Sequence, residues 1–204
     1  MGNIKSIPCE LSREELDGFV SSTHFGDFEI RALWFHFRTI SAKSEKITRS
    51  QFQAAMLFKD TALLDRIFRV FDLDDDNCIG FAEYVKCLST LSSKASQEDK
   101  LRFSFQIYDF DGDERISVDD LTSALAATLR EHNIVFTRTD IDSIVASTML
   151  EASPSEADRI SLPEFQTLVS RRPHMLDHLN LNISRIIEEY SHQSGVTFNT
   201  PRLG

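Results

Sequence analysis

Residues 66–84 read RIFRVFDLDDDNCIGFAEY, an apolar segment of helical period that runs into a group of carboxylates and then resumes. Counting from Asp72, acidic side chains stand at positions 1, 3 and 5, an aliphatic side chain stands at position 8 and a glutamate at position 12. A hard divalent cation takes six to eight oxygens at about 2.3–2.6 Å, and a tightly wound loop of this length turns alternate side chains inward to supply them. The stretch therefore predicts a helix, a Ca²⁺-binding loop and a second helix.

Each predicted ligand of this loop, residues 72–83, has a defined role. The side chains at positions 1, 3, 5 and 12 supply carboxylate oxygens, while position 7 contributes only its main-chain carbonyl, so its thiol does not indicate zinc. Position 6 needs a left-handed backbone, and Asn77 is one of the few residues besides glycine that adopt one at modest cost. The alternative interpretation is a solvated acidic loop without metal. The predicted ligands are Asp72, Asp74, Asp76, Cys78 and Glu83.

The pattern recurs within residues 101–121, LRFSFQIYDFDGDERISVDDL, where the loop spans residues 109–120. Two features weaken this copy. Glu114 at position 6 is unfavourable in the left-handed region, by roughly 1 kcal/mol relative to glycine. Asp120 at position 12 is one methylene shorter than glutamate, which moves the site toward six ligands and Mg²⁺. We expect Ca²⁺ or Mg²⁺ here, the alternative being a metal-free spacer. The acidic residues concerned are Asp109, Asp111, Asp113 and Asp120.

Two further segments, residues 40–51 and 153–164, keep the loop spacing but lack the inward carboxylates. We call them the degenerate loops, and residues 72–83 and 109–120 the carboxylate loops. We expect no metal in a degenerate loop and a structural role instead, because such loops pair through a short two-stranded contact at position 8, as Ile47 would against Ile79. Positions 1, 3 and 5 are Ile40, Ala42 and Ser44 in the first degenerate loop and Ser153, Ser155 and Ala157 in the second.

Four helix-loop-helix repeats at intervals of roughly 30–45 residues predict an all-α protein with two lobes. The polar stretch SSKAS at residues 92–96 is the best candidate linker. Ser12 with Glu15, and Thr137 with Asp140, have the spacing of capping boxes, and Asp27 is a further candidate cap. We expect an N-terminal lipidation segment and helix at 1–26, one loop pair at 27–92, a second at 97–172, and a tail at 173–204.

Both ends of the chain carry further signals. The start, MGNIKS, matches the pattern for N-myristoylation at Gly2, and Cys9 is either a palmitoylation site or a free thiol. The tail has apolar residues at helical period before a segment that looks disordered. We hypothesise that this tail helix docks in an apolar groove and is displaced by a partner, the alternative being a permanent core helix. The stripe comprises Leu179, Ile183, Ile186, Ile187 and Tyr190.

The overall composition argues against several classes of function. The net charge of −10 argues against a nucleic-acid partner, and two bound Ca²⁺ ions would reduce it to −6, that is −10 plus two charges for each ion. Three cysteines cannot all pair, which favours a reducing compartment. No nucleophile constellation or phosphate-binding glycine loop is present in the sequence, so enzyme activity is not expected.

From Leu11 to about Tyr190 the chain resembles the calcineurin B superfamily, and most of all the calcineurin B-like calcium sensors of plants. The resemblance rests on DRIFRVFD, EYVKCLSTL, EDKLRFSFQIYD and RRPHMLDHLNLN, together with four EF-hands behind an MGN start. It implies that position 7 of both carboxylate loops, Cys78 and Arg115, belongs to the ligand set. It also implies a cytoplasmic Ca²⁺ sensor, peripherally attached to membranes by N-myristoylation, that binds an amphipathic helix of a kinase or phosphatase.

The leading hypothesis is thus a Ca²⁺-switched regulatory subunit without catalysis of its own. The alternative is a constitutive structural light chain of a cytoskeletal or axonemal complex, which Mg²⁺-filled or empty loops would favour.

Overall fold

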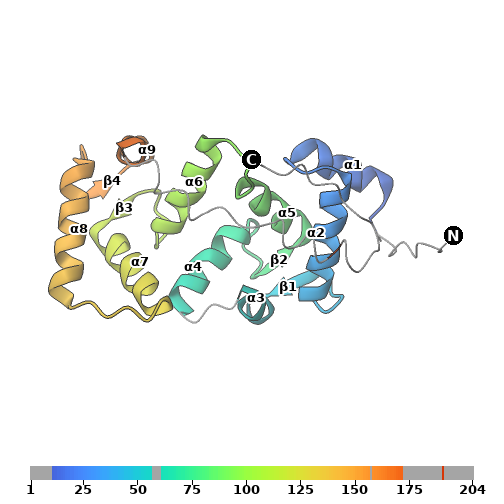
Figure 1. Cartoon of the computed structure of the whole chain (residues 1–204), viewed down its shortest axis with the longest axis horizontal. Coiled ribbons are helices and arrows are strands. Elements are labelled where there is room, and N and C mark those ends of the chain that lie inside the picture. The colour runs from blue at the N-terminus through green and yellow to red at the C-terminus, as the bar shows by residue number, and fades with distance from the viewer. Residues whose placement is uncertain (1–10, 57–60, 157, 172–189, 191–204) are drawn as a thin grey trace, which may run out of the picture.

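The computed structural model describes residues 11–56, 61–156, 158–171 and 190. These residues form helices joined by short loops, with two small antiparallel strand pairs, arranged in an elongated row from α1 and α2 at one end to α8 and α9 at the other (Figure 1). The predicted all-α fold is confirmed. The helices are α1 Arg13–Ser22, α2 Asp27–Ile40, α3 Arg49–Met56, α4 Thr61–Phe71, α5 Phe81–Thr90, α6 Gln97–Tyr108, α7 Val118–Glu131, α8 Arg138–Ala152 and α9 Leu162–Arg171.

Helix starts follow the sequence signals closely. Ser12 and Thr137 each accept a hydrogen bond from the main-chain N–H three residues on, and Glu15 and Asp140 bond back, so both predicted capping boxes are confirmed. The prediction for Asp27 was wrong by one residue. Gly26 is the N-cap of α2, and its main-chain N–H donates to the Glu29 carboxylate at 2.7 Å. Asp27 lies in the first turn, where the helix dipole favours a negative charge.

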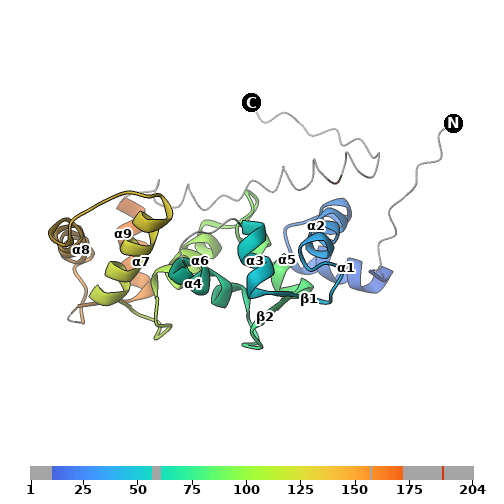
Figure 2. The same ribbon diagram turned by 90° about the horizontal axis from the view of Figure 1, so that it is seen from below.

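Two antiparallel strand pairs join the loops, and each connects one degenerate loop to one carboxylate loop. Strand β1, Lys46–Thr48, is antiparallel to β2, Cys78–Gly80, and the register places Ile47 opposite Ile79, as predicted. Strand β3, Ile116–Ser117, pairs in the same way with β4, Arg159–Ile160. All four position-8 isoleucines are essentially inaccessible to solvent. Figure 2 shows the loops before β2 and β3 on the same long side of the molecule.

The apolar helix faces form two clusters of buried residues. The larger cluster unites α1 to α5 and is rich in aromatic rings, with Phe52 and Phe71 at 5.2 Å between centroids. The smaller cluster unites α6 to α9 around Ile116 and Ile160. Phe103 of α6 belongs to the larger cluster and stacks edge-on with Phe71 at 6.3 Å. The first helix of the second loop pair therefore helps to build the core of the first.

A buried arginine forms a second link between the two loop pairs. Arg66 of α4 is only 9% exposed, and its guanidinium donates hydrogen bonds to the main-chain carbonyl of Gln106 near the end of α6. Carbonyls in the last turn of a helix lack an intrahelical partner, so this contact satisfies one of them. The connecting segment 91–96 is itself packed, because Ser92 and Ala95 are buried.

Several predictions concern residues outside the described ranges. Gly2, Cys9 and most of the tail stripe lie there, so the lipidation and tail hypotheses stay predictions. The one described tail residue, Tyr190, is buried and packs against α2, with ring centroids 5.4 Å from Phe28 and 5.7 Å from Phe35. In the part of the chain that the structure describes, no helix combines the length and apolar character needed to cross a bilayer.

Candidate metal centre

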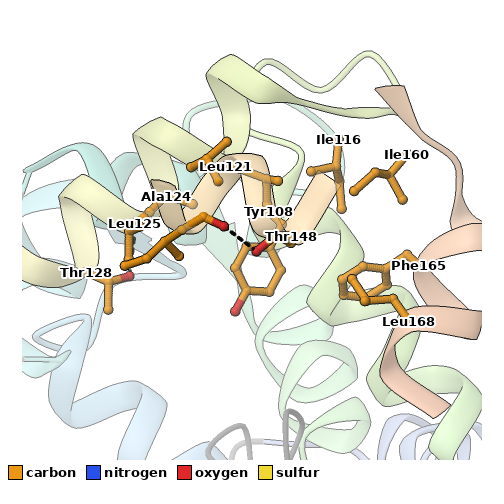
Figure 3. Close-up of a pocket in the computed structure, with 12 residues that line it drawn as sticks. Tyr108, Ile116, Leu121, Ala124, Leu125, Thr128, Thr148, Ile160, Phe165 and Leu168 are labelled. Carbon is orange, nitrogen blue, oxygen red and sulfur yellow. Dashed lines mark hydrogen bonds between the residues drawn. The ribbon is translucent and has the colours of Figure 1, made fainter. Parts of the chain in front are cut away.

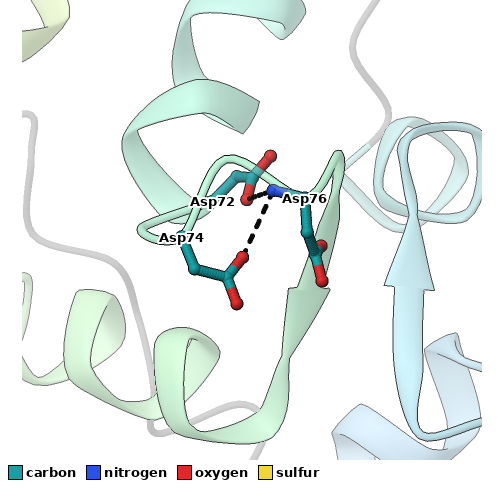
Figure 4. Close-up of side chains that lie close together, drawn as sticks. All are labelled: Asp72, Asp74 and Asp76. Carbon is teal, nitrogen blue, oxygen red and sulfur yellow. Dashed lines mark hydrogen bonds between the residues drawn. The ribbon is translucent and has the colours of Figure 1, made fainter.

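The first carboxylate loop brings its acidic side chains to one point. Asp72, Asp74 and Asp76 each offer a carboxylate oxygen, and these atoms all lie within 4.8 Å of one another (Figure 4). The main-chain N–H of Asp76 donates to Asp72 at 3.1 Å and to Asp74 at 3.3 Å, while Asn77 N–H donates to Asp72 at 2.8 Å. These bonds fix the carboxylates on the inner side of the loop.

The position-12 glutamate closes this loop. One carboxylate oxygen of Glu83 accepts from the main-chain N–H groups of Leu73, at 2.7 Å, and Asp74, at 3.2 Å. The other accepts from Gly80 N–H at 2.6 Å. The side chain thus reaches from the start of α5 back to the beginning of the loop, which is the direction that chelation by both of its oxygens requires.

The second carboxylate loop repeats this arrangement. Oxygens of Asp109, Asp111 and Asp113 also lie within 4.8 Å of one another. Asp120 takes the place of Glu83: one of its oxygens accepts from Phe110 N–H at 3.0 Å and from Asp111 N–H at 3.2 Å, and the other accepts from Ser117 N–H at 2.8 Å. The shorter acid therefore still closes the loop in this structure.

Both carboxylate loops use the left-handed backbone at positions 4 and 6. At position 6, φ is 62° for Asn77 and 65° for Glu114, as predicted. At position 4, φ is 60° for Asp75, whereas the second loop has Gly112 there with φ 83°. The steric cost of a left-handed conformation is thus carried by non-glycine residues at three of these four positions.

Burial and the nearby guanidinium of Arg66 act in opposite directions on the pKa of an acid in the second carboxylate loop. Desolvation raises the pKa of Asp109, while hydrogen bonds from the loop main chain and the positive charge of Arg66 act in the opposite direction. Burial lowers the pKa of Arg66, and the charges of Asp109, Asp120 and Asp111 counteract it. The sequence analysis missed Arg66, whose signal was a basic residue at helical spacing between two apolar ones, three residues after Leu63 and four before Val70.

The degenerate loops share some of these contacts although they lack carboxylates at positions 1, 3 and 5. In the last loop, Glu164 accepts hydrogen bonds from Ser155 N–H at 2.7 Å and from Ser161 N–H and Oγ, which lowers its pKa to about 2. In the first, Gln51 accepts from Thr48 N–H at 2.8 Å. Position 12 therefore reaches back to the beginning of the loop in the last degenerate loop, and to position 9 in the first. The carboxylates at positions 1, 3 and 5 are what set the carboxylate loops apart.

The donor set fits a hard divalent cation. Each carboxylate loop supplies oxygens from three aspartates and a position-12 acid, with no sulfur or imidazole ligand, which suits Ca²⁺ and Mg²⁺ rather than zinc. Cys78 and Arg115 stand at position 7, where only the main-chain carbonyl would be a ligand. Two helix-flanked carboxylate loops, each strand-paired to a degenerate loop, define a Ca²⁺-binding EF-hand protein.

Comparison with known proteins gives the family. Two models of an EF-hand domain pair match residues 43–90 and 98–170. The type 1 calcineurin B of Dictyostelium discoideum is 31% identical over 185 residues, covering 90% of this chain and 99% of the relative. The human type 2 calcineurin B is 29% identical over 83% of this chain and 92% of its own length. Calcineurin B-like protein 5 of Arabidopsis thaliana is 27% identical over 89% of this chain and 93% of its own length.

The chain belongs to the calcineurin B family of EF-hand proteins. It is a non-catalytic protein, in agreement with the sequence analysis.

The strained position 6 of the second carboxylate loop yields a stability prediction. Glu114→Gly removes the Cβ at φ 65° and should stabilise the fold by about 1 kcal/mol, a rise of roughly 2–4 °C in the thermal midpoint of unfolding followed by circular dichroism. Glu114→Gln is the control, because it removes the charge but keeps the Cβ. An equal rise in both variants would assign the gain to charge and refute the backbone explanation.

Proposed function

We propose that this protein is a Ca²⁺-switched regulatory subunit that binds an amphipathic helix of a phosphatase or kinase. The observation that carries the proposal is the pair of carboxylate loops, each placed directly between two helices that contribute to an apolar cluster. A cation held in such a loop acts on both flanking helices, which is how sensor EF-hands change the exposure of an apolar groove. The calcineurin B relatives favour a phosphatase catalytic subunit as the partner.

An apolar pocket in the second loop pair suits such a helix. It has a volume of about 220 Å³, and its lining side chains come from α6 to α9 and from strands β3 and β4 and converge on one hollow (Figure 3). An amphipathic helix presents apolar anchors at i, i+3, i+4 and i+7, and side chains of that kind would fill a pocket of this character. The lining residues are Tyr108, Ile116, Leu121, Ala124, Leu125, Thr128, Ile144, Val145, Thr148, Ile160, Phe165 and Leu168.

The Ca²⁺ affinities of the two carboxylate loops test the proposed sensing role. In a calorimetric Ca²⁺ titration, Glu83→Gln should remove the tighter phase, with a dissociation constant of roughly 10⁻⁷–10⁻⁵ M, and Asp120→Ala only the weaker phase. The reason is that glutamate chelates with both oxygens more readily than aspartate. Glu164→Gln is the matched control, because it removes a position-12 carboxylate from a degenerate loop and should leave the titration unchanged.

Two results would count against the proposal. Loss of the tight phase in Asp120→Ala would reverse the assignment of the loops. Retention of Mg²⁺ in both loops at millimolar Mg²⁺ and micromolar Ca²⁺ would favour the constitutive light-chain function instead.

The pocket makes a prediction about partner binding. Ile144 lines the pocket and is 39% exposed, so Ile144→Asp places a charge where the partner helix would bury it, and affinity for a calcineurin catalytic subunit should fall roughly tenfold or more. Leu150→Asp is the control on the same helix, since Leu150 is 83% exposed and outside the pocket. Equal affinities of the two variants in a pull-down titration with Ca²⁺ would contradict the assignment of the pocket.

The start MGNIKS supports a further proposal, reversible membrane attachment through a myristoyl group on Gly2. One myristoyl chain binds bilayers with a constant of only about 10⁴ M⁻¹, so attachment would be partial unless Cys9 adds a second lipid. Gly2→Ala should move the protein fully into the supernatant when cell lysates are fractionated, and Cys9→Ser should do so in part if a second lipid is present. An unchanged membrane fraction for Gly2→Ala would refute acylation.

A further inference from the structure

In both loop pairs, the degenerate loop presents a basic side chain to the carboxylate loop. The ammonium group of Lys46 forms an ion pair with Oδ2 of Asp76. The guanidinium group of Arg159 donates a hydrogen bond to Oδ2 of Asp113 at 2.5 Å. Lys46 and Arg159 both occupy position 7 of a degenerate loop, and both acids occupy position 5 of a carboxylate loop. The same contact therefore occurs twice in the molecule.

The strand register produces this repetition. Lys46 lies opposite Gly80 in the β1 and β2 pair, and Arg159 lies opposite Ser117 in the β3 and β4 pair. Gly80 and Ser117 are both position 9 of their loops, four residues beyond the acid that is contacted. A long side chain at position 7 of either degenerate loop thus reaches the position-5 carboxylate of its neighbour, because the antiparallel contact fixes the offset.

The second carboxylate oxygen of Asp76 and that of Asp113 each accept a hydrogen bond as well. Oδ1 of Asp76 accepts from the main-chain N–H of Cys78 at 2.9 Å, and Oδ1 of Asp113 accepts from Arg115 N–H at 2.9 Å. Each position-5 carboxylate therefore has one oxygen on its own loop and the other on the cation of the degenerate loop. An arriving divalent cation must share one of these oxygens or displace its partner.

We propose that Lys46 and Arg159 are built-in counter-cations that set the divalent-ion affinity of the carboxylate loops; this inference rests on the Ca²⁺-binding function proposed above. In the ion-free loop, the basic group offsets the mutual repulsion of the crowded acids. In the loaded loop, the same group lies close to a doubly charged ion and opposes it. Both ion pairs are partly exposed. The side-chain exposure is 44% for Lys46 and 34% for Asp76, and it is 46% for Arg159 and 35% for Asp113. Solvent screening therefore keeps the effect moderate.

This arrangement gives the degenerate loops a part in ion binding although they have no carboxylates at positions 1, 3 and 5. Each loop pair then contains one exchangeable cation and one tethered cation that share a position-5 carboxylate. A change at position 7 of a degenerate loop is thus a way to adjust affinity without altering a ligand.

The test is a calorimetric Ca²⁺ titration of the full chain and of Lys46→Met and Arg159→Met. Each substitution should raise affinity about three- to tenfold at low ionic strength, Lys46→Met in the first carboxylate loop and Arg159→Met in the second, and the gain should shrink in high salt. Thermal unfolding should show the ion-free variants destabilised and the loaded variants unchanged or stabilised. The conservative variants Lys46→Arg and Arg159→Lys should keep the affinity of the natural chain.

Matched charge removals serve as controls. Lys43→Met removes a positive charge from position 4 of the degenerate loop that contains Lys46, and Arg138→Met removes a positive charge from α8. Neither variant should raise the Ca²⁺ affinity as far as Lys46→Met or Arg159→Met does. Unchanged or reduced affinity in Lys46→Met and Arg159→Met, with binding intact in the natural chain, would overturn the inference alone. Absence of Ca²⁺ binding in the natural chain and in every variant would overturn the proposed function and this inference with it.

Discussion

The antiparallel contact between buried position-8 isoleucines is the constraint on which the rest of the structure depends. Ile47 against Ile79, and Ile116 against Ile160, hold the four loops in two pairs, and the isoleucines themselves are buried in the apolar clusters. A loop that has lost its carboxylates still supplies half of such a contact. This explains physically how the degenerate loops can keep helical flanks and a buried isoleucine without carboxylates at positions 1, 3 and 5.

The strand pairing also brings a basic side chain to each carboxylate loop. The inward acids of these loops are held by hydrogen bonds from the loop main chain, so the loop itself orients these carboxylates. Preoriented like charges repel one another, and nearby basic groups offset that repulsion. Lys46 and Arg159 act within each pair, and Arg66 brings a charge from the first loop pair to the acids of the second. The acids of the second carboxylate loop thereby interact with a charge from the first loop pair.

Sequence predicted the local features well, since their chemistry requires a fixed spacing. The clustering of three aspartates in each carboxylate loop, the left-handed conformations of Asn77 and Glu114, both capping boxes and the pairing of Ile47 with Ile79 all depend on residues within one loop or one strand pair. The burial of Arg66, the packing of Tyr190 on α2 and the cations at position 7 were not predictable in that way. They depend on helix packing between distant segments and on a strand register that places side chains opposite a neighbouring loop.

The central claim is that two of four EF-hand loops hold divalent cations while their partners serve as structural and electrostatic supports. The most direct measurement is the number of Ca²⁺ ions bound per chain at saturation, by equilibrium dialysis against radioactive calcium with protein concentration from amino-acid analysis. The account predicts two ions per chain, one for each cluster of three aspartates. Four ions, or none, would contradict it.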